Sequence, residues 1–358
     1  MPSTPTWLIT GSSGLIGSEA VRHFAAPGRR ILGLDNNLRA NFFGPEADTR
    51  WNLALLREEV RGFQHVDLDV RDRTAVQALF EQVRPDVVIH CAAQPSHDLA
   101  RERPFDDFEV NAAGTLNLLE ATRRHVPESP FVFLSTNKVY GDAPNELPMV
   151  ELETRFELAR PEHREGVSET CRIDASKHSL FGVSKTAADL YVQEYGRYFS
   201  IPTVSFRCGC LTGPRHSGVE LHGFLSHLVK TAVSGRPYTV FGYGGKQVRD
   251  QIHSHDVCTA IEAWLASPRP GDVFNLGGGR ESNASILECA AHIGSLLGRD
   301  VELQLDSTPR EGDHICYISD TRLFKKDHPG WRLTRTLPDL IEELVRNETD
   351  RRSLASGA

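Results

Sequence analysis

The chain has 358 residues, of which 39% are apolar and 25% charged, and its formal net charge is −8. These values are typical of a soluble globular protein with one large domain or two coupled ones, and the acidic balance argues against electrostatic binding of nucleic acid. The seven cysteines form no C-x-x-C pair, which argues against a disulfide framework and a zinc site, and we expect no metal. No apolar run reaches the ~18 residues of a membrane span and no leader-like segment precedes the first predicted strand, so we expect a cytoplasmic protein without membrane contact.

Short apolar runs alternate with helical patterns over the first part of the chain. The runs that predict strands are 7–10, 31–34, 63–68, 87–91 and 131–134. This alternation predicts an α/β fold of the Rossmann type, with a doubly wound parallel sheet. Helices predicted at 105–124 and 179–199 should lie beside the carboxyl edge of that sheet, where such sheets bind ligands.

In the second half, clusters of Gly and Pro separate shorter elements, and a late strand is predicted at 272–276. We expect residues 1–208 to form the Rossmann domain, with segments at about 250–280 returning to it, and residues 209–345 to form mainly a smaller, interleaved substrate-binding lobe. The tail 346–358, which ends in Ser-Leu-Ala-Ser-Gly-Ala, is predicted to be disordered.

A glycine-rich motif follows the first predicted strand and opens a helix. It reads Gly11-Ser12-Ser13-Gly14-Leu15-Ile16-Gly17, with the spacing G-x-x-G-x-x-G. Gly11 allows a tight turn, Gly14 lets the backbone approach a pyrophosphate, and Gly17 lets the helix pack on the strand. The amides at the start of the helix, around Leu15 and Ile16, are then available to an anion. The motif therefore predicts a dinucleotide site.

Asp35 closes the second predicted strand, 35 − 11 = 24 positions after Gly11. A carboxylate at this place accepts hydrogen bonds from the hydroxyls of an adenosine ribose and repels a 2′-phosphate. We therefore predict that the cofactor is NAD rather than NADP, with Asp35 and its neighbour Asn36 in contact with it. Arg39 is the one nearby cation that argues for NADP.

The run Ser179-Leu180-Phe181-Gly182-Val183-Ser184-Lys185 resembles the active-site helix of the short-chain dehydrogenase/reductase superfamily, in its extended branch. That helix normally carries Tyr-x-x-x-Lys, in which the ammonium one turn away depresses the pKa of the phenol. Here Phe181 stands in place of the tyrosine, while Lys185 is kept. A phenyl ring cannot carry a proton, so the proton must come from another group, or the reaction needs no strong base at that point.

The resemblance implies further cofactor contacts in the first half of the chain. Asp69-Val70-Arg71-Asp72 resembles the motif at the adenine edge, and Asn111 resembles the asparagine that stabilises the central helix. His90-Cys91-Ala92-Ala93-Gln94 resembles the fourth-strand segment whose small residues let the cofactor pass. The cofactor residues implied in this way are Asp69, Val70, Ala92, Ala93, Gln94 and Asn111, with Lys185 at the nicotinamide ribose.

The run Ser135-Thr136-Asn137-Lys138-Val139-Tyr140-Gly141-Asp142 resembles a segment of nucleotide-sugar epimerases and dehydratases, and this resemblance places Thr136 where a hydroxyl polarises the substrate. Sugar-nucleotide 4,6-dehydratases typically carry Asp-Glu at the next two positions, where this chain has Asn137 and Lys138. The segment is similar to that of the CDP-tyvelose (CDP-paratose) 2-epimerase group, as is the stretch Glu-Leu-Glu-Thr-Arg at 151–155, which is followed by an insertion running to His178. The insertion predicts a long loop over the sugar pocket.

The same resemblance assigns two arginines to the diphosphate of a nucleotide. Arg249 lies in Gly245-Lys246-Gln247-Val248-Arg249-Asp250, and Arg310 lies in Pro309-Arg310-Glu311-Gly312-Asp313. The fork geometry of a guanidinium group can satisfy two phosphate oxygens at once. His97, beside Gln94-Pro95-Ser96, is predicted as a further substrate contact.

The group that replaces the phenol stays open among His178, His97, Lys138 and Tyr140, because a base must come within hydrogen-bond reach of the substrate hydroxyl. The catalytic residues predicted are Thr136, Asn137, Lys138, His178, Phe181 and Lys185. Cys208 and Cys210 are expected to be buried structural thiols.

These motifs predict an NAD-dependent epimerase of a nucleotide-activated sugar. Such an enzyme acts by transient oxidation of a ring hydroxyl to a ketone. Two alternatives stay open: an atypical sugar or nucleoside dehydratase at the same NAD site, and a catalytically silent NAD-binding protein. The family resemblance also implies a homodimer, formed through the helices at about 105–124 and 180–198.

Overall fold

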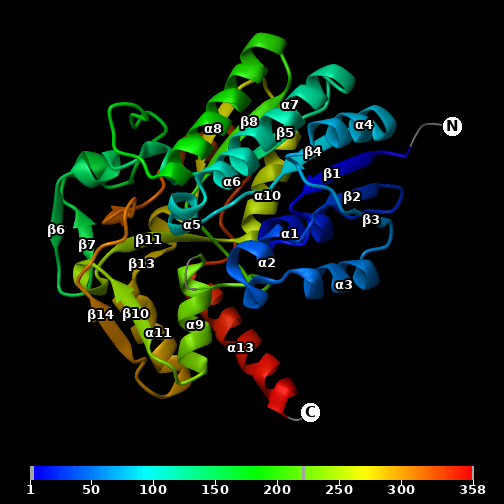
Figure 1. The fold of residues 1–358 in the computed structure, drawn as a ribbon. Coiled ribbons are helices and arrows are strands. Elements are labelled where there is room, and N and C mark those ends of the chain that lie inside the picture. The colour runs from blue at the N-terminus through cyan, green and yellow to red at the C-terminus, as the bar shows by residue number, and fades with distance from the viewer. Residues whose placement is uncertain (1–3, 220–221, 357–358) are drawn as a thin grey trace.

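The computed structural model of the protein describes residues 4–219 and 222–356. Its largest sheet has seven strands in the order β12-β8-β5-β4-β1-β2-β3, and all neighbours in it are parallel (Figure 1). The strands are β1 (Thr6–Thr10), β2 (Arg30–Leu34), β3 (Phe63–Val66), β4 (Val87–His90), β5 (Phe131–Thr136), β8 (Thr203–Cys208) and β12 (Asp272–Leu276). The predicted α/β fold of the Rossmann type is confirmed.

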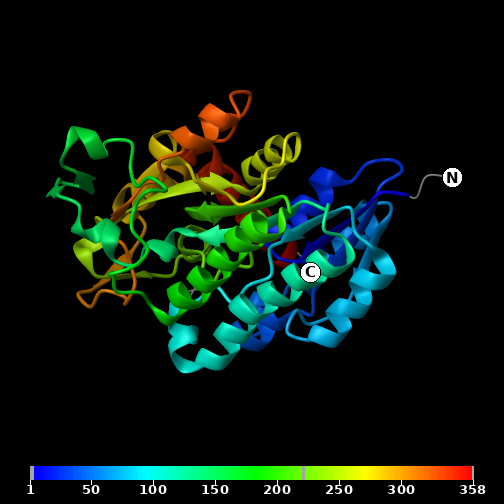
Figure 2. The same cartoon turned by 90° about the horizontal axis from the view of Figure 1, so that it is seen from above.

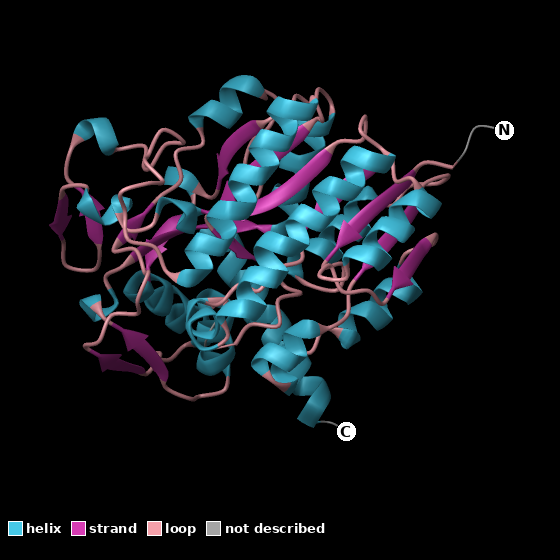
Figure 3. Ribbon diagram, turned by 45° about the horizontal axis from the view of Figure 1, so that its top comes forward, coloured by secondary structure: helices cyan, strands magenta, loops and turns pink. Residues whose placement is uncertain are grey.

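Helices cover both faces of this sheet (Figures 2 and 3). Side chains of successive strand residues point to opposite faces, so Leu8 and Ile9 of β1 belong to two different apolar cores. On the Ile9 face pack α1 (Leu15–Phe24), α3 (Arg50–Glu59) and α10 (Ser254–Leu265). On the Leu8 face pack α4 (Arg73–Val83), α7 (Gly114–His125) and α8 (Leu180–Phe199).

The helix predicted at 105–124 is divided into three parts. It consists of α6 (Pro104–Phe108), a π-helical turn η2 (Glu109–Ala113) and α7. Asn111 lies in the π-helical turn. Such turns contain one extra residue and occur frequently at functional sites.

The second lobe has two small sheets and a helical core. Strand β11 (Val248–His253) pairs with β9 (Cys210–Thr212), β13 (Asn283–Ser285) and β15 (Cys316–Tyr317), and β10 (Tyr238–Phe241) pairs with β14 (Leu303–Asp306). Helices α9 (Phe224–Val233), α11 (Ile286–Leu297) and α13 (Leu337–Ser356) share one apolar core. The division of the chain at residue 208 stays a prediction.

The remaining elements are short and connect the larger ones. They are α2 (Leu38–Phe43), η1 (Pro45–Ala47), α5 (His97–Glu102), η3 (Asn137–Tyr140), η4 (Ala143–Glu146), β6 (Met149–Glu151), β7 (Phe156–Leu158), η5 (Pro161–His163), η6 (Tyr243–Gly245), η7 (Gly279–Glu281) and α12 (Arg322–Asp327). None of the helices in the described part of the chain combines the length and the apolar character needed to cross a bilayer.

The predicted disorder of the tail is wrong for residues 346–356, because α13 continues to Ser356. Ile341 and Leu344 bury the start of this helix against α9 and α11. Near its end, the Arg351 guanidinium donates to the carbonyl of Pro214 at 3.2 Å and lies 4.9 Å from the centre of the Trp51 ring. Tertiary contacts therefore keep this segment helical, although its composition favours disorder. Residues 357–358 lie outside the described part of the chain.

Candidate active site

A continuous cavity of 460 Å³ lies at the carboxyl edge of the large sheet. The first domain contributes the glycine loop, the ends of β2, β4 and β5, and one face of α8, while the second lobe contributes residues from β10, β11 and the segment 310–313. The predicted residues on its wall are Gly11, Gly14, Leu15, Ile16, Gly17, Asp35, Asn36, Asp69, Val70, Ala92, Ala93, His97, Thr136, Asn137, Lys138, Phe181, Lys185, Arg249 and Arg310. Parallel sheets of this type bind ligands at this edge.

The glycine loop leaves room that a side chain would fill. Gly11 has a φ of +63°, and a Cβ there would lie 2.8 Å from the amide nitrogen of Ala92. A Cβ on Gly17 would lie 2.0 Å from the carbonyl oxygen of Gly11. Within the described ranges no side chain caps the start of α1, so its first amides remain available to an anion. This cradle fits the pyrophosphate of a dinucleotide.

Asp35 joins the glycine loop to the end of β2. Its carboxylate accepts hydrogen bonds from the amides of Ser13 at 2.9 Å and Asn37 at 2.8 Å. Arg39 also lies on the cavity wall, but its guanidinium donates to the carbonyl of Ser217 at 2.8 Å, and burial lowers the pKa of Arg39 to about 10. The part of the cavity wall that carries the Asp35 carboxylate fits an adenosine ribose without a 2′-phosphate.

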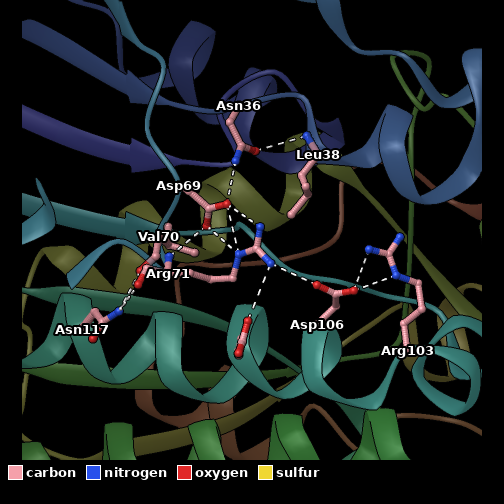
Figure 4. A network of polar contacts seen from close by, with 9 residues as sticks. Asn36, Leu38, Asp69, Val70, Arg71, Arg103, Asp106 and Asn117 are labelled. Atoms are coloured by element: carbon pink, nitrogen blue, oxygen red, sulfur yellow. Dashed lines mark hydrogen bonds and ion pairs between the residues drawn. The ribbon is translucent and has the colours of Figure 1, made fainter. Parts of the chain in front are cut away.

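Asp69 belongs to a polar network that braces the adenine end of the cavity (Figure 4). Its carboxylate accepts from Asn36 at 3.0 Å and from Arg71 at 2.7 Å, and Arg71 also donates to Asp106 of α6 at 3.1 Å. The carbonyl of Val70 accepts from Asn117 of α7 at 3.0 Å. The carboxylate of Asp69 is thus neutralised by an arginine that its own motif supplies.

Gln94 and Asn111 are predicted to contact the cofactor, but in the structure both are buried and neither lies on the cavity wall. The Asn111 side chain accepts from the Gln94 amide and donates to the Gln94 carbonyl, each at 2.9 Å, and it also donates to Ser184 of α8 at 3.1 Å. These bonds hold the segment after β4 against α8. The two residues therefore position Ala92 and Ala93, which do line the cavity.

The end of β5 turns directly into the 3₁₀ helix η3. The Thr136 hydroxyl caps this helix by accepting from the Lys138 amide at 3.2 Å, and it donates to the Asn137 side chain at 3.3 Å. All three side chains lie on the cavity wall. An amide and an ammonium therefore stand where a carboxylate pair would be needed to expel water.

Phe181 and Lys185 lie one turn apart on α8 and face the cavity. The Lys185 ammonium donates to the carbonyl of Leu134 at 2.8 Å and lies 4.1 Å from the centre of the Phe133 ring. Burial lowers the pKa of Lys185 to about 8. The cation is kept, but a phenyl ring stands one turn before it in place of a phenol.

Two of the four candidate proton carriers lie outside the cavity. The His178 ring nitrogens face the carbonyls of Ser176 at 2.9 Å and Val139 at 2.8 Å, and the Tyr140 hydroxyl donates to Asn275 at 2.7 Å. Neither His178 nor Tyr140 lines the cavity, so the structure gives no support to the prediction of His178 as a catalytic residue. His97 and Lys138 remain.

The second lobe brings charged groups to the other end of the cavity. Lys138 donates to the Gly312 carbonyl at 3.0 Å and lies 3.6 Å from Asp313, to which Arg249 donates at 2.5 Å. Burial alone would raise the pKa of the Asp313 carboxyl, but Arg249 and Lys138 outweigh it and hold that pKa well below its usual range. The Arg310 guanidinium lies 4.2 Å from the centre of the Phe241 ring.

Sequence reasoning assigned no role to Asp313 or Gly312, although both stand in the motif that carries Arg310. A carboxylate three positions after an arginine predicted to bind phosphate was the available signal. The insertion is also placed differently from the prediction. None of residues 151–178 lines the cavity. The hairpin β6–β7, from which the insertion continues, instead contacts the second lobe through Glu151 with Lys246 at 2.7 Å and Arg155 with Glu288 at 3.3 Å.

Known proteins resemble this chain over nearly its whole length. The model of the NAD dependent epimerase/dehydratase family matches residues 7–277. CDP-paratose 2-epimerase of Salmonella typhi is 32% identical over 323 residues, which cover 88% of this chain and 91% of that protein. A dTDP-glucose 4,6-dehydratase of Xanthomonas campestris pv. campestris is 30% identical over 360 residues, covering 95% and 92%. The crystal structure of a UDP-glucose 4-epimerase of Thermus thermophilus in complex with NAD has a TM-score of 0.76 at 28% identity, covering 96% of this chain and 98% of that one. The glycine cradle, the seven-stranded sheet and these matches together show that this chain belongs to the NAD-dependent epimerase/dehydratase family.

Proposed function

We propose that this protein is an NAD-dependent epimerase of a nucleotide-activated sugar. The observation that carries the proposal is the pair Asn137 and Lys138 on the cavity wall directly after Thr136. Expulsion of water from a sugar needs an acid that protonates the leaving hydroxyl and a base that removes the proton from the neighbouring carbon. Inversion through a ketone needs one proton carrier and a reversible hydride acceptor. The similarity to a CDP-paratose 2-epimerase supports the same choice.

The residues around the glycine cradle fit NAD. The amides of α1 would hold the pyrophosphate, Asp35 the adenosine ribose, and Lys185 the nicotinamide ribose. When bound, NAD supplies a hydride acceptor that returns the hydride later in the same turnover. The small side chains of Ala92 and Ala93 leave space beside the end of β4.

The other end of the cavity fits a nucleoside diphosphate. Arg249 and Arg310 present guanidinium groups that can each bind two phosphate oxygens. The Phe241 ring beneath Arg310 provides an apolar surface for the nucleoside. A sugar on this diphosphate would then lie toward Thr136, where the hydroxyl can bind the oxygen that becomes a ketone.

A dehydratase is the second candidate, and one observation favours it. Phe181 changes the part of the cavity where the superfamily's proton carrier normally stands, and a rebuilt pocket is consistent with altered chemistry. The similarity to a dTDP-glucose 4,6-dehydratase extends over 95% of the chain. Elimination would proceed from the same ketone, because a carbonyl acidifies the neighbouring C–H bond.

We also propose that the protein forms a homodimer through α6 and α8. Large apolar side chains on these helices are exposed, with Phe105 and Tyr198 about four-fifths accessible at 81% and 80%. The exposed apolar residues of this surface are Phe105, Phe108, Leu180, Val183, Leu190, Tyr191, Tyr198 and Phe199. Exposed apolar surface on neighbouring helices is typical of a protein interface.

Incubation of the purified protein in D₂O with CDP-, UDP- and GDP-hexoses tests these proposals. Mass spectrometry of the products, after exchange of hydroxyl deuterons back to protons, separates the outcomes. An isomeric product without carbon-bound deuterium is expected for oxidation and return of hydride at one carbon. A product lighter by one water, or one with carbon-bound deuterium, would favour the dehydratase. A protein without bound nicotinamide and without any response to added NAD would contradict both.

A further inference from the structure

His97 stands beside the phenyl ring that replaces the usual phenol. It is the first residue of α5, while Phe181 lies on α8, and their rings meet edge to face with centres 5.1 Å apart. Both side chains line the cavity. The imidazole therefore lies next to the position from which a tyrosine would reach the substrate, although the two residues are 181 − 97 = 84 positions apart in the sequence.

Ser179 holds this imidazole in place. The Ser179 oxygen caps α8 by accepting from the Gly182 amide at 3.1 Å, and it lies 2.6 Å from Nδ1 of His97. A hydroxyl can donate to a bare Nδ1 or accept from a protonated one, so the contact survives when the imidazole gains or loses a proton. Nε2 makes no hydrogen bond with any residue in the described ranges 4–219 and 222–356, and it is the nitrogen available to a ligand.

The other groups on this part of the wall are engaged. Lys138 donates to the Gly312 carbonyl and pairs with Asp313, and Lys185 donates to the Leu134 carbonyl. The Thr136 hydroxyl bonds within its own turn and remains suited to orient the reacting oxygen. His97 is thus the cavity-lining candidate that has a nitrogen lone pair to offer and a partner that tolerates both protonation states.

We infer that His97, positioned by Ser179, carries the proton that tyrosine carries in members of the superfamily with Tyr-x-x-x-Lys. This role rests on the proposed function, because it presupposes oxidation of a sugar hydroxyl. The O–H bond of that hydroxyl would break and its proton would bond to Nε2, while a bound nicotinamide would accept the C–H hydrogen with its electron pair. When the ketone is reduced from its other face, the same proton returns to the oxygen. Neither protons nor electrons are consumed.

The charges that face His97 make this transfer depend on bound substrate. They are the cations Lys138, Arg249 and Arg310, the anion Asp313, and the imidazole of His222. Burial, followed by the field of Lys138, lowers the pKa of His97 to about 3, so its side chain is neutral and can accept a proton at neutral pH. A diphosphate on Arg249 and Arg310 would offset the cationic field and stabilise the protonated imidazole. His97 therefore becomes a stronger base when a nucleoside diphosphate is bound.

Three variants of the full-length protein test the inference. His97→Ala removes the proton carrier, His97→Ala with Phe181→Tyr supplies a phenol one turn from Lys185 in the space that is vacated, and His125→Ala is the control. His125 is a half-buried histidine of α7 outside the cavity wall, bonded to Gln77 at 3.1 Å. With a nucleotide sugar that the wild type converts, we expect His97→Ala to lower kcat by roughly 10²- to 10⁴-fold, the usual contribution of general acid–base catalysis, with KM changed little. The double variant should regain about tenfold or more of the lost kcat, since phenol and imidazole do the same work.

A second measurement requires no turnover and is made on the wild-type protein. Imidazole ¹⁵N NMR of the wild type, with the His97 signal assigned by its absence from His97→Ala, is followed against pH with and without CDP. We expect CDP to raise the pKa of His97. If CDP binds and the titration of His97 does not move, or if His97→Ala keeps more than about a third of the wild-type kcat, the inference is overturned while the proposed function stands. A double variant no faster than His97→Ala would overturn it as well. A wild-type protein inert toward every nucleotide sugar would overturn the proposed function, and the inference with it.

Discussion

Neutralising Asp35 should change which dinucleotide the protein selects. The Asp35→Asn substitution keeps the size of the side chain but removes its charge. The carboxylate accepts hydrogen bonds from the amides of Ser13 and Asn37. It lies on the cavity wall, where the ribose of NAD would place its hydroxyls. Both the ribose bonds and the repulsion of a 2′-phosphate should weaken together.

The two effects have calculable sizes. Hydrogen bonds to a charged group contribute ~1.5–3 kcal/mol, so the Kd of NAD should rise by roughly 10- to 150-fold. Two unit charges about 5 Å apart at an effective dielectric constant of about 20 repel by ~3 kcal/mol, so the Kd of NADP should fall by roughly tenfold or more. The preference for NAD over NADP is therefore expected to shrink by at least about 100-fold.

Isothermal titration calorimetry with NAD and with NADP measures this preference. The matched control is Asp67→Asn, the same change of charge at an exposed residue outside the cavity wall. It should leave both affinities within about twofold of the wild type, as is usual for an exposed surface substitution. Equal losses for NAD and NADP in Asp35→Asn would refute the reasoning, because they would indicate a distorted glycine loop rather than a lost charge.

Three further predictions concern the fold and the assembly. Gly17→Ala places a Cβ 2.0 Å from the Gly11 carbonyl oxygen, so it should cost ~1–3 kcal/mol of stability and abolish NAD binding. The control Gly330→Ala has no described atom within 4 Å of the added Cβ, and calorimetry should find its Tm and NAD binding unchanged. Burial lowers the pKa of His90 to about 3, so below pH ~6.5 the unfolded chain binds a proton at this residue that the folded chain does not. His90 alone should lower the free energy of unfolding by ~2 kcal/mol between pH 6.5 and pH 5, beside the losses from His97 and His216, and urea unfolding of His90→Gln should lack this part. Val183→Glu puts a charge on the exposed apolar surface of α8 and should convert a dimer to a monomer in sedimentation, a prediction that fails if the wild type itself sediments as a monomer.

The parts of the site that local geometry dictates could be predicted from the sequence. The glycine spacing after β1 fixes a turn, and the carboxylate at the end of β2 follows from strand length, so the cradle and Asp35 lie together as expected. Phe181 and Lys185 share a face of α8 because four positions span one helical turn.

Contacts between distant segments could not be predicted in the same way. His178 is three positions before Phe181 but points to backbone carbonyls, because Ser179 starts the helix and turns the preceding residue away. His97 reaches Phe181 from a different strand end, which only the assembled sheet brings near. The predictions for the insertion and the C-terminal tail differ from the structure for a related reason, because composition does not reveal the surface against which a segment packs.

Because β12 lies at the edge of the large sheet and comes late in the sequence, the sheet can be completed only late in synthesis of the chain. β8 lies between β5 and β12, and residues 209–271 separate β8 from β12 along the chain. At ~5–20 residues per second, synthesis of these residues takes about 3–13 s, during which β8 is an open strand edge on an otherwise assembled sheet. Its residues from Thr203 to Cys208 are all buried in the finished protein. The nascent chain is therefore expected to expose an apolar strand edge until nearly half of its second lobe has been made.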